Sequence, residues 1–153
     1  ADVEEKRARL TELKKERLAT KVVEAKDRVE RNPTDPQLRF SYASLLYETE
    51  DFTAAIPELQ RAKSKPHVRI KALLMLGKCF DKKNMLDMAV NQLEEADKEL
   101  HGMDGTKKEL LYEKGVILEK MGKKDEALEA FKLIYEADYG FLDVAQRVES
   151  SYS

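Results

Sequence analysis

The chain has 153 residues, of which 42% are hydrophobic and 38% are charged. This length and this balance predict one helix-rich folded domain with a core of its own, and they exclude a disordered chain. The formal net charge of −2 excludes a global electrostatic field that would favour nucleic acid or an acidic membrane. A single cysteine, Cys79, excludes a disulfide framework and a metal site made of several cysteines, and it is expected to be a small buried side chain.

Residues 1–31 predict one long charged helix, because they contain no proline or glycine and carry ten basic and eight acidic side chains. A narrow apolar seam follows its second half at helical spacing: Leu18, Val22, Ala25 and Val29. The main interpretation is a helix that covers the next elements of the chain, with a solvated extension before it. Two alternatives are the end of a coiled coil or of an adjoining unit lost by truncation, and disorder up to about Lys15.

The segment 32–36 then interrupts the helical pattern with two prolines. Asp35 followed by Pro36 is a helix start signal, since aspartate accepts hydrogen bonds from first-turn N–H groups and proline suits the first helical position. A helix is therefore predicted over 37–49. A second helix, which Thr53 can cap and which includes Pro57 in its first turn, is predicted to follow and to end at residues 64–66.

Residues 70–96 predict two short helices, over about 70–82 and 87–98, with apolar residues at helical spacing. Gly77 lies in the middle of the first helix, where a glycine is unfavourable by about 1 kcal/mol relative to alanine. Ala89 lies on the inner face of the second helix. Small residues at these two places indicate that the two helix backbones pack closely against one another.

Two glycines in the segment 101–105 mark a turn. The sequence TKKE at 106–109 has the spacing of a capping box and predicts that a helix starts there. That helix is expected to end at Gly122, and a further helix is expected over 125–137. The amphipathic pattern of 141–150 predicts one more short helix.

The three helix pairs repeat at a regular spacing. Ala43 lies 34 residues before Gly77 (77 − 43 = 34), and the third pair is displaced from the second by 38 residues (115 − 77 = 38) because four residues are inserted. The matched positions are Ala43, Ala55, Leu59 and Ala62, then Gly77, Ala89, Leu93 and Ala96, then Gly115, Ala127, Phe131 and Ile134.

A helix-turn-helix period of 34 residues is typical of the tetratricopeptide repeat, and on these residues the chain resembles that family from about Asp35 to Ala137. It departs from the family at Ile134, where a small residue is preferred, and in having no tryptophan early in the first helix of each pair. Those places are held by Arg39, Leu73 and Leu111. The resemblance implies an all-α, right-handed α-solenoid of three repeats with a long N-terminal helix and a short C-terminal capping helix.

The expected organisation has five parts: the N-terminal helix over 1–34, repeats over 35–66, 67–101 and 102–137, and the capping helix over 138–153. A repeat array needs its last apolar face covered by a more polar element, and 141–150 fits that role. The alternative is a C-terminal motif that is offered to a partner.

No catalytic or metal-binding pattern stands out, and no cofactor is expected. His67 and His101, the only histidines, fall in a loop or at a helix end without a second ligand at metal spacing. The lysines near the third repeat alternate with glutamates, which predicts a solvated mixed-charge face and excludes a nucleic-acid-binding stripe. No apolar run approaches the ~20 residues of a membrane span, and no signal peptide is visible.

In proteins of this family, the first helix of each repeat lines a concave groove that often holds a peptide. The resemblance therefore implies a partner-binding groove made by these residues: Phe40, Ser44, Tyr47, Lys71, Leu74, Lys78, Lys82, Tyr112, Val116 and Lys120. Lys78 and Lys82 are one turn apart and suit an acidic group of a partner. The alternative is that some of these side chains pack beneath a terminal helix. Glu109 and Glu113 would repel a C-terminal carboxylate, which argues against the chaperone-tail adaptors of the family.

The sequence thus predicts a non-catalytic scaffold or adaptor that binds a protein or peptide segment. One alternative is self-association through residues 1–31 or through a repeat end. Another is a docking or regulatory segment of a larger enzyme or secretion component, since the chain begins without methionine inside a charged helix and is expected to be a fragment. The cytoplasm is the default location.

Overall fold

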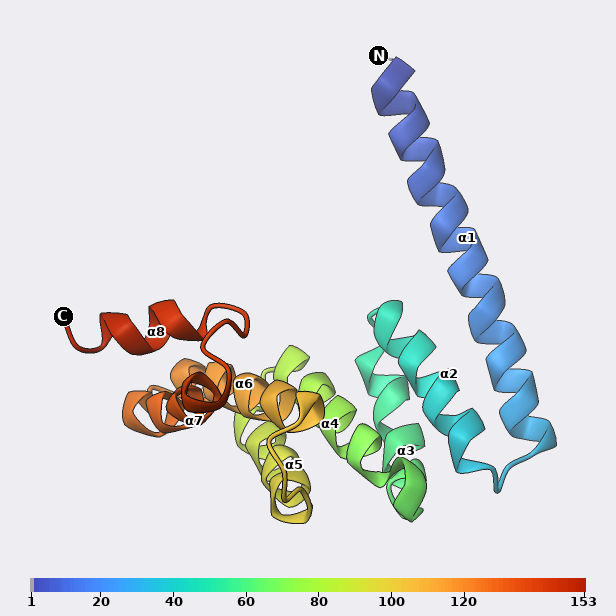
Figure 1. Ribbon diagram of the computed structural model, residues 1–153. Coiled ribbons are helices and arrows are strands. Elements are labelled where there is room, and N and C mark those ends of the chain that lie inside the picture. Colours follow the sequence, from blue (N-terminus) through green and yellow to red (C-terminus); the bar gives the residue numbers. More distant parts are fainter. Residues whose placement is uncertain (1) are drawn as a thin grey trace. The chain divides into compact units, whose positions relative to one another are not determined.

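The computed structural model of the chain describes residues 2–153 (Figure 1). Within this range the secondary structure consists of eight α-helices and no strand. The helices are α1 (Asp2–Arg31), α2 (Pro36–Glu48), α3 (Phe52–Ala62), α4 (Pro66–Lys82), α5 (Leu86–Glu99), α6 (Gly105–Lys120), α7 (Lys124–Ala137) and α8 (Val144–Ser150). The predicted all-α fold of paired helices is confirmed.

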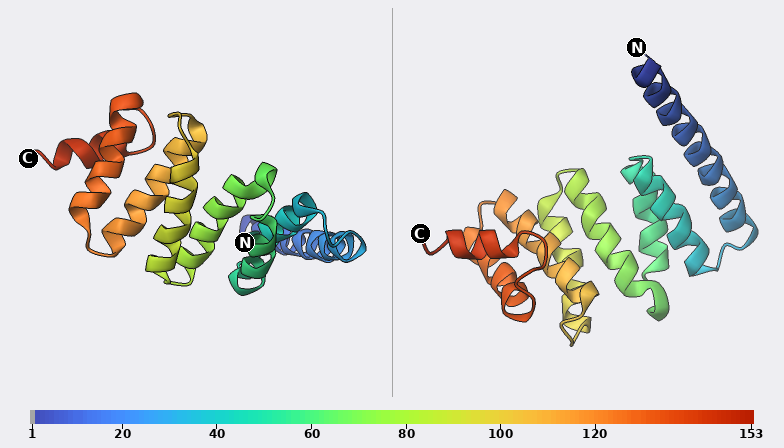
Figure 2. Two further views of the ribbon diagram at one scale, coloured as in Figure 1. Left: turned by 90° about the horizontal axis from the view of Figure 1, so that it is seen from below. Right: turned by 45° about the horizontal axis from the view of Figure 1, so that its top comes forward.

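The chain divides within α4 into two compact units, one up to Ala72 and one over Leu73–Ser153. In the first unit α1 packs against α2, and α2 packs against α3. Helix α1 buries only Ala25 and Val29, both near its C-terminal end. Its N-terminal half extends beyond the α2–α3 pair (Figures 1 and 2). Because α1 is helical from Asp2, the alternative of disorder in the first residues is wrong.

Three aspartates begin helices as caps. Asp35 Oδ1 accepts hydrogen bonds from the backbone N–H of Gln37 at 2.9 Å, as the sequence predicts. Asp51 caps α3 in place of Thr53, and Asp104 caps α6, which therefore starts before the expected capping box at 106–109. In both places an aspartate lies just upstream of the threonine, and a carboxylate also interacts favourably with the positive end of the helix dipole.

The turns within the three helix pairs share one backbone conformation. Glu50, Asn84 and Gly122 occupy equivalent repeat positions and have φ values of 63°, 60° and 80°. In each turn the next residue donates its N–H to a carbonyl five residues earlier, for example Asp51 to Leu46 at 2.9 Å. This pattern is a Schellman motif, whose left-handed residue is normally glycine. Only the third repeat has glycine there.

The second unit contains the close helix packing that the small residues predict. A Cβ atom on Gly77 would lie 2.6 Å from Leu93 Cδ2 and 3.5 Å from the Ala89 carbonyl oxygen. A Cβ atom on Gly115 would lie 2.7 Å from the ring of Phe131. Both glycines are therefore required for the contact between α4 and α5 and between α6 and α7, because no larger residue fits without displacing a buried side chain.

Helix α8 closes the second unit by packing against α7 (Figure 1). Its buried side chains are Val144 and Val148. The helix begins three residues later than expected, because Phe141 to Asp143 form a turn in which Leu142 has a φ of 44°. The predicted short C-terminal helix is therefore present, and it is preceded by an irregular segment that also contacts α6.

Candidate functional site

Two ion pairs connect α4 and α6 in the second unit, and each helix supplies the lysine of one pair and the carboxylate of the other. Lys78 Nζ on α4 lies 2.8 Å from Glu109 Oε1 on α6. Three residues further along α4 and eleven residues further along α6, Lys120 Nζ lies 2.8 Å from Asp81 Oδ1. These side chains are partly exposed, so the pairs form a polar strip on one face of α4 and α6.

Glu113 lies among these four charges. Burial raises the pKa of its carboxyl above the ordinary value, the nearby Lys78 and Lys120 lower it, and Asp81 and Glu109 raise it again. The net shift is upward because burial disfavours the charged form more than the two lysines favour it. The strip thus contains a half-buried carboxylate whose charged form is disfavoured by burial.

An aromatic cluster formed by Tyr112, Phe131 and Phe141 connects α6 with α7 and with the segment that precedes α8. The Tyr112 ring makes edge-to-face contacts with Phe131, at 5.7 Å between centroids, and with Phe141, at 6.2 Å. The Tyr112 hydroxyl donates a hydrogen bond of 2.8 Å to Asp143 Oδ1. Tyr112 is therefore covered by the segment that precedes α8, which bears out the alternative that a groove residue packs beneath a terminal element.

Arg147 on α8 completes the cluster. Its guanidinium carbon lies 4.9 Å from the Phe131 ring centroid and 5.6 Å from that of Tyr112. It also donates through Nε to Asp143 Oδ1 at 2.9 Å and pairs with Glu119 on α6. Burial tends to raise the pKa of Asp143, but the hydrogen bonds from Arg147 and Tyr112 outweigh it, and the pKa lies below its ordinary value.

The predicted groove residues of α2 belong to the first unit and are partly exposed. The Ser44 hydroxyl donates to the Phe40 carbonyl oxygen of its own helix at 3.0 Å. The Tyr47 ring contacts Phe52 edge to face, with 5.2 Å between centroids. The side chains of Ser44 and Tyr47 are thus held by local contacts, and the role of Phe40, Ser44 and Tyr47 as groove residues stays a prediction.

The predicted groove residues of α4 and α6 divide into three groups. Leu74 is 8% exposed, so the expectation that it lies open on a groove is wrong: it belongs to the core. Lys78 and Lys120 meet in the polar strip, and Val116 is half-buried on the same helix as Lys120. The side chains of Lys71 and Lys82 are exposed.

Sequence reasoning missed Asp143 and Arg147. Both lie outside the three repeats from which the groove was projected. Their spacing of four residues with the acid first was nevertheless a signal, since such pairs stabilise helices. What the sequence could not supply was the long-range contact of Arg147 with the rings of α6 and α7.

The remaining chemically reactive side chains take structural or solvated roles. Cys79 is fully buried, and burial raises the pKa of its thiol to about 11, so the prediction of a small buried side chain is confirmed. His67 and His101 are exposed. Over residues 2–153, no group of three or more histidine, cysteine, aspartate or glutamate side chains is placed to hold a metal ion. No helix in this range is both long and apolar enough to span a bilayer.

Residues 108–140 match the sequence profile of the tetratricopeptide repeat. This match covers the third helix pair, and the first two pairs have the same spacing between their two helices and a left-handed residue at the equivalent turn position. The third helix pair therefore matches the tetratricopeptide repeat by sequence, and the chain as a whole has the tetratricopeptide repeat fold. Solved tetratricopeptide structures with a similar fold support this assignment.

One such structure is the MamA protein, which is 18% identical with a TM-score of 0.76, covering 90% of this chain and 73% of MamA. Another is YrrB, described as "a TPR protein with an unusual peptide-binding site". YrrB is 20% identical with a TM-score of 0.68, and the match covers 81% of this chain and 62% of YrrB. The chain thus spans less than two thirds of YrrB. No curated protein sequence matches the chain. At these identities the likeness establishes the tetratricopeptide fold.

Proposed function

We propose that this tetratricopeptide repeat protein is a non-catalytic interaction module, and that the polar strip of α4 and α6 binds a segment of a partner protein. The strip consists of Lys78, Asp81, Glu109, Glu113 and Lys120. The family consists generally of interaction modules, and the first helices of its repeats line the groove that holds peptides. The peptide-binding site described for YrrB belongs to that protein and supports the proposal only by analogy.

The observation that carries the proposal is the half-buried carboxylate of Glu113 between two ion pairs. Partly exposed pairs such as Lys78–Glu109 stabilise a fold by only about 0–1 kcal/mol. The burial of Glu113 disfavours its charged form. The strip therefore does little for stability, whereas it offers donors and acceptors on adjacent helices that can exchange their partners for groups of a bound segment. Perturbed carboxylates of this kind are frequent at binding sites.

The proposal is tested with an array of extended peptides probed with the chain and with the double variant Lys78→Glu, Lys120→Glu. We expect peptides that bind the parent chain to bind this variant at least tenfold more weakly, because both cations of the strip are reversed. Glu113→Gln keeps the shape of the side chain and removes its charge. This variant should weaken the binding of peptides that contain a lysine or arginine and leave the binding of neutral peptides unchanged.

The matched control is Lys98→Glu, since Lys98 is exposed in the last turn of α5, away from the strip. Peptides that bind the double variant as tightly as the parent would show that the strip is not the binding surface. A Tyr112 variant is a poor test, because Tyr112 holds the C-terminal segment in place.

Self-association through α1 is a second candidate function. Leu10 and Leu13 are 53% and 43% exposed on a helix whose residues 2–17 are all exposed. Light scattering of the chain with and without residues 1–31 tests this idea. A mass that is monomeric and independent of concentration in both cases would eliminate it.

A further inference from the structure

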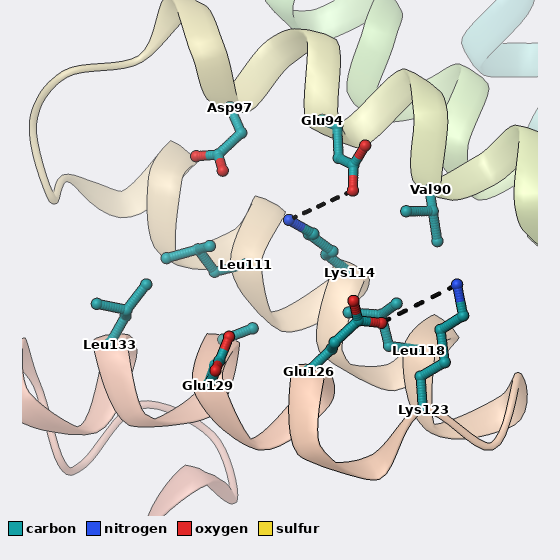
Figure 3. Close-up of a pocket in the computed structure, with 11 residues that line it drawn as sticks. Val90, Glu94, Asp97, Leu111, Lys114, Leu118, Lys123, Glu126, Glu129 and Leu133 are labelled. Atoms are coloured by element: carbon teal, nitrogen blue, oxygen red, sulfur yellow. Dashed lines mark ion pairs between the residues drawn. The ribbon is translucent and has the colours of Figure 1, made fainter.

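A second surface of the second unit, distinct from the polar strip, has the features of a docking groove. It lies between α5 and α7, with α6 at its base, and encloses about 210 Å³ (Figure 3). Its apolar lining comes from all three helices: Val90 on α5, Leu111 and Leu118 on α6, and Ala130 and Leu133 on α7. Of these, Leu133 is 48% exposed. We refer to this surface as the α5–α7 groove.

Four carboxylates border the α5–α7 groove. Glu94 and Asp97 extend toward it from α5, and Glu126 and Glu129 extend toward it from α7 (Figure 3). Two lysines of the lining, Lys114 and Lys123, compensate only half of this charge. The lining therefore combines an apolar floor with carboxylates on both walls, and its own charged residues are four acidic and two basic.

The ion pairs inside the groove are loose. Lys114 Nζ lies 3.8 Å from Glu94 Oε1, and Lys123 Nζ lies 4.0 Å from Glu126 Oε2 (Figure 3). Both separations exceed the distance of a good hydrogen bond. Asp97 is instead paired with Lys107, which lies outside the groove lining. A ligand cation can therefore form shorter contacts with Glu94, Glu126 and Glu129 than the resident lysines do.

We propose that the α5–α7 groove binds a segment of a partner protein in which a large apolar side chain is flanked by lysine or arginine. The apolar side chain would lie on the exposed Leu133, at the edge of the buried Leu111 and Leu118. The flanking cations would pair with carboxylates on the two walls. Charge complementarity selects this class of partner, because an acidic segment would meet like charges on both sides.

This inference goes beyond the function proposed above, because the two surfaces use different faces of α6. Leu111, Lys114 and Leu118 line the groove, whereas Glu109, Glu113 and Lys120 belong to the polar strip. One surface can bind while the other does not. A variant on one face is therefore an internal control for the other.

The test uses a fluorescently labelled twelve-residue peptide with a central Leu-Phe pair flanked by arginines, and the same peptide with glutamates in place of the arginines. Two-dimensional ¹H–¹⁵N NMR spectra of the full chain locate the binding. We expect the arginine peptide to shift the amide signals of Val90, Ala130 and Leu133 in a saturable way, and the glutamate peptide to leave them unchanged.

The double variant Glu126→Lys, Glu129→Lys should weaken binding of the arginine peptide at least tenfold. Leu133→Ser should weaken its binding severalfold. All three side chains are exposed, so these variants leave the core intact. Glu136→Lys, the same type of substitution at one site two turns further along α7 from Glu129 and outside the groove, is the control for each single change and should bind as the parent does.

Four results would overturn the proposal: no binding of the arginine peptide at millimolar concentration, signal shifts centred on α4 and on Val116, equal binding of the glutamate peptide, and equal binding by the double variant. The second result would favour the polar strip as the binding surface. The last two would indicate non-specific attraction or an apolar contact elsewhere.

Discussion

The two terminal helices are anchored in opposite ways. Helix α1 has 30 residues and buries two of them, Ala25 and Val29, at one end. Helix α8 has seven residues and also buries two, and its Arg147 contacts two aromatic rings and two carboxylates of the second unit. The comparison shows that specific contacts, and not helix length, determine how firmly a terminal element is held. A long helix that is partly buried only from Leu18 to Val29 leaves the rest of its surface for other uses.

The largest effect is expected from Phe131→Ala. Phe131 is 2% exposed and contacts Tyr112, Arg147 and the backbone of Gly115, so its removal creates a cavity and releases α8 together with α7. We expect the free energy of unfolding to fall by about 3–5 kcal/mol, measured by urea denaturation followed by circular dichroism. Leu13→Ala on α1 is the contrasting variant and should change it by less than about 0.5 kcal/mol. Equal losses would contradict the comparison.

Gly115→Ala is expected to have the next largest effect. The added methyl group would lie 2.7 Å from the Phe131 ring, which cannot move freely because Tyr112 and Arg147 hold it. Overpacking of this kind destabilises by about 1–3 kcal/mol, again measured by urea denaturation. Gly102→Ala, where no atom lies within 4 Å of the added group, is the control and should have little effect. If Gly115→Ala left the free energy of unfolding unchanged, α6 and α7 could move apart without loss of stability.

Arg147→Met sharpens the comparison of the two ends, because it keeps much of the apolar volume and removes the charge. We expect a smaller loss of about 1–2 kcal/mol and faster amide hydrogen exchange over residues 141–151, with exchange in α1 unchanged. Faster exchange in α1 as well would mean that the variant acts on global stability. No change in 141–151 would mean that the two buried valines alone hold α8.

The C-terminal contact should also depend on pH. Because the pKa of Asp143 is lowered in the folded chain, its contribution is fully present above its unfolded pKa of about 3.9 and is lost as the pH falls through the folded value. The Tyr112 ring signals in NMR spectra should therefore shift toward exposed values at pH below about 4. Asp143→Asn should remove that dependence. A transition near pH 6 would point to a different group.

The smallest effect is expected at the turn of the first repeat. Glu50 holds a φ of 63°, a conformation that favours glycine, and the equivalent third-repeat residue is Gly122. Glu50→Gly should raise the free energy of unfolding of the first unit by about 0.5–1 kcal/mol. Gly122→Ala should lower that of the second unit by a similar amount, which gives a matched pair of opposite sign in thermal denaturation.

The sequence predicted the helix pairs well because their packing depends on local side-chain volume. Gly77 against Leu93 and Gly115 against Phe131 follow from the spacing of small and large residues alone. The groove residues were harder to predict, because exposure depends on contacts far along the chain. Tyr112 was placed on the correct face of α6, but nothing in the repeat pattern indicates that Asp143 and Phe141 cover it.

The same limit explains the other differences. Leu74 lies on the projected groove side of α4, yet it is buried. A helical projection gives the direction of a side chain but not which other residues cover it, so the exposure of Leu74 could not be predicted in this way. Arg39 takes the place of a large apolar residue early in the first helix of the repeat. In the structure it pairs with Glu58 at 2.7 Å and donates to the Pro33 carbonyl oxygen. The repeat pattern does not predict that a polar side chain can be held at this position by such contacts.

The single thiol of the chain provides a practical consequence of the packing around α4. Cys79 is fully buried and its pKa is about 11, so a thiol-specific reagent at neutral pH should react with it only when the helices around it come apart. The labelling rate therefore reports how often this part of the protein opens, without any engineered probe. Each variant described above can be ranked by that rate in dilute, non-denaturing buffer, where the chain would have to work.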